Sequence, residues 1–108
     1  MATIINISNK LNNEQKYLSL GEDKKYKVND SYKTVMKVSE LFNNPEVDNS
    51  SAMMDAIELF LGKSARKEME DMSIDSVKVI YIALMAIVQN VSYEDMAARF
   101  QAVEQSQV

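Results

Sequence analysis

The stretch VKVIYIALMAIVQN, from Val77 to Asn90, constrains the fold of this chain more than any other segment. At about 100° per residue on a helix, apolar side chains point in nearly every direction, and Lys78 is the only charged residue. The apolar run at 79–88 is about half as long as a membrane span. The segment therefore predicts a central helix, covered on both sides by other elements.

The two faces of this helix differ in how easily the chain can cover them. One face carries Val77, Ile80, Tyr81, Leu84, Ile87 and Val88, and the opposite face carries Val79, Ile82, Ala83 and Ala86. Burying one large apolar side chain is worth about 1.5–3 kcal/mol, so a face left in water is a serious loss. The second face is either wrapped by the chain itself or kept for another protein chain, and the sequence leaves both interpretations open.

Length and charge narrow the class of protein. The 108 residues suit one domain, 1–108, in which we expect a β-hairpin region at 1–29 and a helical region at 30–108. The net charge is −4, whereas phosphate backbones and anionic lipids attract basic patches. We therefore expect neither nucleic acid nor a membrane as partner. The N-terminus, MATIINISNK, does not read as a secretory signal, which favours a cytoplasmic location.

The N-terminal region has the alternation typical of strands. TIINIS at 3–8 is rich in β-branched residues and predicts a strand, followed by a turn at Asn12-Asn13. Leu18 and Leu20 alternate before the turn at 21–24, and Tyr26 and Val28 alternate after it, which predicts a hairpin. So small a sheet is stable only when it packs against helices.

From residue 30 the apolar period changes to that of helices. Asp30 or Ser31 caps a first helix that ends at 43–45, and a second helix runs from Ser50 or Ser51 to Gly62. A short helix at 63–72, the central helix after Ser73 and a final helix after Ser92 follow. The expected fold is mostly α (α+β), with a small N-terminal β-hairpin or sheet packed on a bundle of four to five helices.

The residue types that most often act in catalysis or bind metal ions are missing from the sequence. The sequence has no histidine and no cysteine, and so lacks the usual general base, thiolate nucleophiles and Cys-based zinc sites. GKS at 62–64 looks like the end of a phosphate-binding loop, but Ile57 stands where that loop needs glycine. The acidic residues at 68, 70 and 71 lack the spacing of a calcium loop. We expect no enzyme, no cofactor and no metal site.

The order of these segments resembles a known family. KKYKVNDSYKTVMKVSELF (24–42), then AIELFLGKSARKEMEDMS (56–73), then the apolar helix and a last amphipathic one, is similar to the tail assembly chaperones of long-tailed bacteriophages and related prophages of Gram-positive bacteria. The resemblance covers about residues 16–104, and its most telling part runs from Leu59 to Ser73. The strand predicted at 3–8 has no counterpart that can be placed.

The resemblance implies a mostly helical protein of the host cytoplasm without catalysis. Such chaperones coat the tape-measure protein, meet the tail tube protein, self-associate into homo-oligomers and are absent from the finished particle. Many are made in two lengths by a ribosomal frameshift, and the resemblance implies that this chain matches the short form, although the sequence does not show a frameshift. Two alternatives remain: a small regulatory or antitoxin-like binding protein, and a structural component of a phage particle.

Six apolar residues are candidates for the surface that meets a partner or another copy. Methionine suits surfaces that repack against changing partners, and the chain has 8 methionines. The candidates come from the second helix, the second face of the central helix and the stripe of the last helix: Met53, Val79, Ile82, Met96, Phe100 and Val103.

Overall fold

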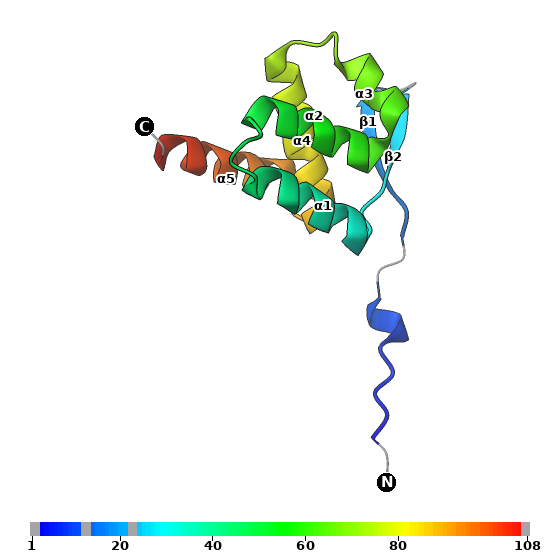
Figure 1. The fold of residues 1–108 in the computed structure, drawn as a ribbon. Coiled ribbons are helices and arrows are strands. Elements are labelled where there is room, and N and C mark those ends of the chain that lie inside the picture. The colour runs from blue at the N-terminus through cyan, green and yellow to red at the C-terminus, as the bar shows by residue number, and fades with distance from the viewer. Residues whose placement is uncertain (1–2, 12–13, 22–23, 107–108) are drawn as a thin grey trace.

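The computed structural model describes residues 3–11, 14–21 and 24–106, with side chains described as far as Gln101. Within these ranges the chain is mostly helical, with one small antiparallel sheet, as the sequence predicts (Figure 1). The elements are β1 (Lys16–Gly21), β2 (Lys24–Val28), α1 (Tyr32–Asn43), α2 (Asn49–Leu61), α3 (Lys63–Met69), α4 (Ile74–Gln89) and α5 (Tyr93–Ser106).

The hairpin forms as predicted and lies against α4. Leu18 pairs with Tyr26, and Lys16 pairs with Val28. Leu18 and Val28 are buried, so one face of the sheet belongs to the core and the other is exposed. The tip of the predicted turn, at 22–23, lies outside the described residues.

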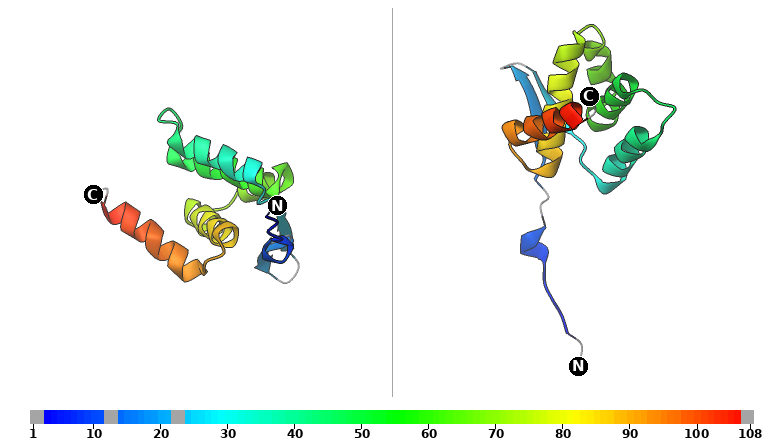
Figure 2. Two further views of the ribbon diagram at one scale, coloured as in Figure 1. Left: turned by 90° about the horizontal axis from the view of Figure 1, so that it is seen from below. Right: turned by 90° about the vertical axis from the view of Figure 1, so that its left-hand side faces the viewer.

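The strand predicted at 3–8 is wrong. Residues 3–11, which we call the N-terminal arm, run away from the body of the molecule in Figure 1 and in Figure 2 (right), with a single 3-10 turn at Ser8–Lys10. The β-branched composition favours an extended backbone, but a strand also needs a neighbour for its N–H and C=O groups. The turn predicted at Asn12-Asn13 lies outside the described residues.

Side-chain caps set the helix starts. The hydroxyls of Ser31, Ser73 and Ser92 accept hydrogen bonds from backbone N–H groups three residues on, at 3.3, 3.2 and 3.1 Å. α2 begins at Asn49, one residue before the predicted start near Ser50, and its cap is Asp48, which accepts from the N–H of Ser51 at 2.8 Å. A carboxylate at this position satisfies a free helical N–H and also favours the positive end of the helix dipole.

α4 is the central helix that the sequence predicts. It contacts α2, α5 and β1, and in Figure 2 (left) it lies between the α1–α2 pair, α5 and the hairpin. Its first predicted face forms the core, because Val77, Ile80, Tyr81 and Leu84 are all buried. On the second face Ala86 is buried and Ile82 and Ala83 are half-buried, whereas Val79 is 50% exposed. The chain therefore covers this second face only in part.

Candidate protein-interaction surface

Two apolar hollows meet at the corner where α3 leads into α4. The first, which we call the β1–α4 hollow, measures about 390 Å³ and lies beside the end of β1. Apolar side chains make most of its wall, and polar atoms of Asp75 and Ser76 lie among them. Its lining residues are Leu20, Met72, Asp75, Ser76, Val79 and Ile80.

The second hollow, which we call the methionine hollow, lies between α2, the end of α3 and the start of α4. It measures about 210 Å³, and four of its lining side chains are methionines. Ile74 at its edge is 57% exposed. The hollow is lined by Ser50, Met53, Met54, Met69, Glu70, Met72, Ile74 and Val77.

Met72 lines both hollows, so the apolar surface continues around the start of α4. Flexible thioethers adapt to differently shaped partners, because they have several low-energy conformations and a polarizable sulfur. Exposed, concave apolar surface with a few polar groups is the usual character of a protein or ligand contact site. This corner is the strongest candidate site among the described residues.

The structure brings together two of the six residues expected from the sequence. Val79 lines the β1–α4 hollow, and Ile82, half-buried, follows it one helical turn along α4. Met53, half-buried, lines the methionine hollow and is connected to Val79 through Met72. Met53 and Val79 lie on α2 and α4, far apart in the chain but adjacent at the corner, whereas Ile82 lines neither hollow.

The three candidates on α5 lie elsewhere. Met96 is 3% exposed, and so offers almost no contact area to a partner in this conformation. Phe100 is half-buried and packs edge-to-face on Tyr81, with ring centroids 5.6 Å apart. Val103 belongs to α5, but its side chain lies outside the described part of the chain. Burial of Tyr81 in this contact raises the pKa of its hydroxyl to about 12.

Sequence reasoning missed Leu20, Met72 and Ile74. The sequence indicated only that Leu20 alternates with Leu18 in the hairpin, and in the structure it is half-buried near the end of β1. Met72 and Ile74 flank the Ser73 cap, at a turn where helical periodicity is interrupted. A face cannot be assigned across such a turn from spacing alone, so the only available signal was the density of methionines.

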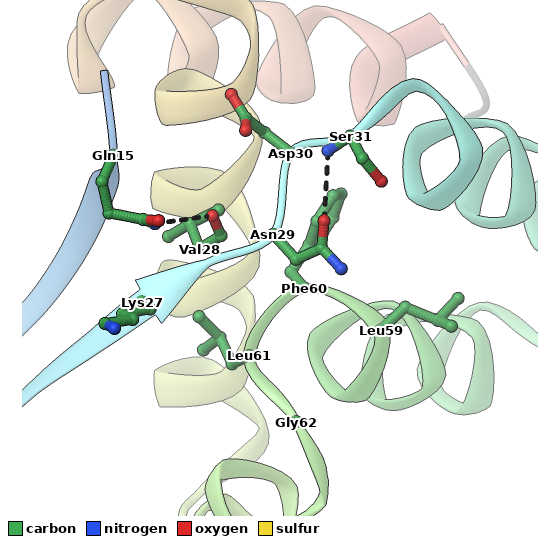
Figure 3. A pocket seen from close by; sticks show the side chains of 10 residues that line it. All are labelled: Gln15, Lys27, Val28, Asn29, Asp30, Ser31, Leu59, Phe60, Leu61 and Gly62. Atoms are coloured by element: carbon green, nitrogen blue, oxygen red, sulfur yellow. Dashed lines mark hydrogen bonds between the residues drawn. The ribbon is translucent and has the colours of Figure 1, made fainter. Parts of the chain in front are cut away.

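Another hollow, of about 500 Å³, has a more polar lining and lies where parts of the fold join. It lies where the hairpin, the start of α1 and the end of α2 meet, and its lining includes Gln15, Asn29 and Gly62 (Figure 3). The backbone N–H of Asn29 donates to the carbonyl of Phe60 at 2.8 Å, and the Gln15 side chain donates to the carbonyl of Val28 at 3.3 Å. The first bond joins the end of the hairpin to α2, and the second closes the base of the hairpin, which explains the polar lining.

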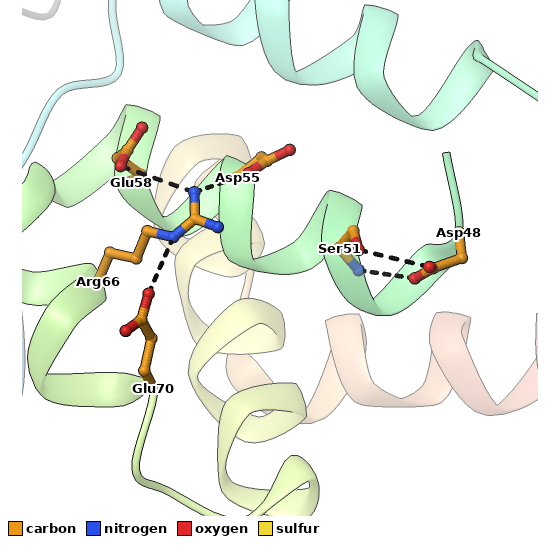
Figure 4. A network of polar contacts seen from close by, with 6 residues as sticks. All are labelled: Asp48, Ser51, Asp55, Glu58, Arg66 and Glu70. Atoms are coloured by element: carbon orange, nitrogen blue, oxygen red, sulfur yellow. Dashed lines mark hydrogen bonds and ion pairs between the residues drawn. The ribbon is translucent and has the colours of Figure 1, made fainter. Parts of the chain in front are cut away.

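Ion pairs at the protein surface also stabilise the fold. Arg66 on α3 contacts Asp55 at 2.7 Å, Glu58 at 3.6 Å and Glu70 at 3.5 Å, and so ties α3 to α2 (Figure 4). The hydrogen bond to Asp55, followed by the charges of the same acids, raises the pKa of Arg66. Glu70 also lies at the wall of the methionine hollow, which gives that hollow an acidic edge.

Two further contacts fix the hairpin. The Lys16 ammonium lies 3.0 Å from Asp30 and donates to the carbonyl of Ile87 at 3.2 Å, at the end of α4. The Tyr26 hydroxyl donates to Glu68 on α3, and this hydrogen bond raises the pKa of Tyr26. The acidic run at 68–71 thus contributes two contacts to the fold, one through Glu68 and one through Glu70.

Two further properties apply to the described ranges. No group of three or more acidic side chains among these residues is placed to hold a metal ion. No single helix in them is both long and apolar enough to cross a membrane.

Comparisons of this chain with protein-family models, with curated protein sequences and with solved structures find no match.

Proposed function

We propose that this chain is a non-enzymatic assembly chaperone of the host cytoplasm that shields apolar helical surface on another protein. Its client is the tape-measure protein of a long-tailed phage, and it also helps to recruit the tail tube protein. The assignment to phage tails is supported by the resemblance at 24–42 and 56–73. The mode of binding is supported by the structure of the α3–α4 corner.

The methionine hollow, with Ile74 exposed beside it, is the observation on which the proposal depends. An amphipathic helix binds such a groove by inserting apolar side chains spaced three or four residues apart. The half-buried Met53 and Met54 can change rotamer to fit different insertions along a long client. Arg66 is the one basic partner of Asp55, Glu58 and Glu70 in this cluster, and the negative charge that remains favours client segments with a Lys or Arg beside the apolar stripe.

Weak contacts of this kind suit a chaperone that is later displaced. Each hollow holds only a few side chains, so one copy binds weakly. Many copies along one long client give high total occupancy, because binding sites on the same chain act together. Tube subunits that bind the same client more tightly then replace the copies one at a time.

Co-expression with the tape-measure protein tests this function. We expect an affinity-tagged tape-measure protein to be soluble only when this chain is present, and to retain it through purification. Purified finished particles should lack the chain. A tape-measure protein that remains insoluble or captures none of this chain contradicts the proposal, and recovery of the chain from finished particles favours a structural component instead.

A further inference from the structure

The N-terminal arm exposes four large apolar side chains to solvent. Ile4 is 87% and Ile5 79% exposed, and Ile7 and Leu11 are also exposed. The arm points away from the body in Figure 1 and in Figure 2 (right). Its β-branched residues favour an extended backbone, so the arm needs only a partner edge to become a strand.

The hairpin offers such an edge. Among the described residues β1 pairs only with β2, so the opposite edge of β1 has no neighbouring strand. The β1–α4 hollow opens at one end of β1, at Leu20, and a further hollow opens at the other end, at Tyr17. An unpaired edge beside open apolar surface is a template for strand addition.

The side-chain pattern of the arm matches that of β1. On β1, Leu18 and Leu20 face the helices, whereas Tyr17 and Ser19 face outward. In the arm, Ile5 and Ile7 share one face, and Ile4 and Asn6 share the other. A strand placed beside β1 with Asn6 next to Ser19 brings Ile5 and Ile7 next to the two leucines, whichever way the strand runs.

We propose that the N-terminal arm of one copy adds as a third strand to the free edge of β1 in a second copy, and that Ile5 and Ile7 cover the β1–α4 hollow and Val79. This inference goes beyond the proposed function and requires no client. It also gives the two hollows different roles: self-association uses the β1–α4 hollow, and the methionine hollow stays open.

A second copy fits better than the arm's own hairpin. Within the arm, the Lys10 N–H donates to the carbonyl of Ile7 at 2.8 Å and the Ser8 N–H donates to the Asn6 side chain at 2.9 Å. These bonds form a turn, and the segment before it leads away from the arm's own β1 (Figure 1). A second copy carries the same arm and the same edge. Reciprocal exchange therefore closes a dimer, and one-way exchange builds a chain of copies.

Engineered cysteines test the contact directly, because the chain has none of its own. An Asn6→Cys chain is mixed with a Ser19→Cys chain carrying a larger tag, and the mixture is oxidised. We expect a disulfide between the two chains, since residues opposite one another on adjacent strands lie within reach of one. The matched control is Lys25→Cys, which is exposed and pairs with Ser19 one strand farther away.

The outcomes of this experiment are distinct. Mixed disulfides that form at Ser19 and scarcely at Lys25 support arm exchange. Equal yields at both positions, or none at either, overturn it. A single chain carrying both Asn6→Cys and Ser19→Cys shows whether the arm binds its own edge: efficient oxidation at monomer mass also overturns the proposal.

A second measurement uses the two faces of the arm. Ile7→Lys places a charge on the face that meets the leucines and should reduce the mass in solution to that of a monomer. Ile4→Lys makes the same change on the outward face and should leave the oligomer intact. If both variants keep the oligomer mass of the unaltered chain, or if that chain is itself a monomer at every concentration, the arm is not the contact.

Discussion

Phe100 of α5 packs edge-to-face on Tyr81 of α4, with an angle of 86° between the rings, and Phe42 of α1 lies 5.3 Å from the same tyrosine ring. Tyr81 thus connects three helices that are distant in the chain. Aromatic pairs in this geometry contribute about 0.5–1.5 kcal/mol beyond the area that they bury. The orientation of α5 depends on this cluster.

Replacement of Phe100 should therefore loosen α5. For Phe100→Ala we expect the free energy of unfolding to fall by about 2 kcal/mol, less than for a fully buried phenylalanine because Phe100 is half-buried. Denaturant unfolding followed by circular dichroism measures the change. Phe100→Leu, the control, keeps most of the apolar contact and should lose less than half as much. Equal losses would contradict this expectation, because they would mean that the aromatic ring alone, and not apolar contact in general, holds α5 in place.

Alkaline pH should destabilise the fold through Tyr81. Burial raises the pKa of Tyr81 from 10.0 to about 12, so the folded state holds the phenol proton more tightly than the unfolded chain. This contribution is complete below pH 10 and is lost as the pH rises through 12, by up to about 3 kcal/mol. The Tyr81→Phe variant has no phenol to ionise at position 81, so its free energy of unfolding should not show this fall at alkaline pH. Unfolding curves of both proteins between pH 9 and 12 that stay parallel would contradict the assignment.

The Arg66 cluster should stabilise the contact between α2 and α3 modestly. Arg66→Met keeps the apolar stem but removes the charge that faces Asp55, Glu58 and Glu70. We expect a loss of about 1 kcal/mol at low salt, because the pairs are partly exposed, and a smaller loss at about 1 M salt. Lys67→Met, on the same helix, is the control and should change little. A loss that salt does not reduce would mean that packing, not charge, is responsible.

Substitution of Gly62 should destabilise the fold through the backbone conformation at this position alone. Its φ of 101° and ψ of 169° lie in a region that only glycine adopts easily, and an added Cβ meets no atom within 4 Å. Gly62→Ala should therefore cost about 1–3 kcal/mol without any steric clash. Thermal unfolding of this variant and of Lys63→Ala, the exposed neighbour, compares the two positions. Equal stability of the two variants would show that the link between α2 and α3 relaxes freely.

Local rules predicted the regular elements well. Alternation at Leu18 and Leu20 located the hairpin, and serine caps located three of the helix starts, because these signals act within a few residues. The arm was predicted wrongly because a strand depends on a partner edge, and composition says nothing about one. Spacing placed Met96 on a stripe, but it could not show that this stripe faces α4 instead of a partner.

The candidate surface was only partly predictable for the same reason. Val79 was found because it lies opposite the core face of a helix whose register is clear. Met72 and Ile74 were missed because the cap at Ser73 reorients the chain between them. Which apolar side chains stay exposed at such a corner is decided by how α2, α3 and α4 pack together.

Capture of the tape-measure protein by two matched variants tests the central claim most directly. Ile74→Glu places a charge at the edge of the methionine hollow, where a carboxylate in the first turn of α4 suits the helix dipole, so folding should be preserved. Gln101→Glu makes the same charge change at an exposed position on α5. We predict that Ile74→Glu lowers the amount of chain retained by the tagged tape-measure protein at least tenfold, while Gln101→Glu retains as much as the unaltered chain. Equal retention of both variants would contradict client binding at the methionine hollow.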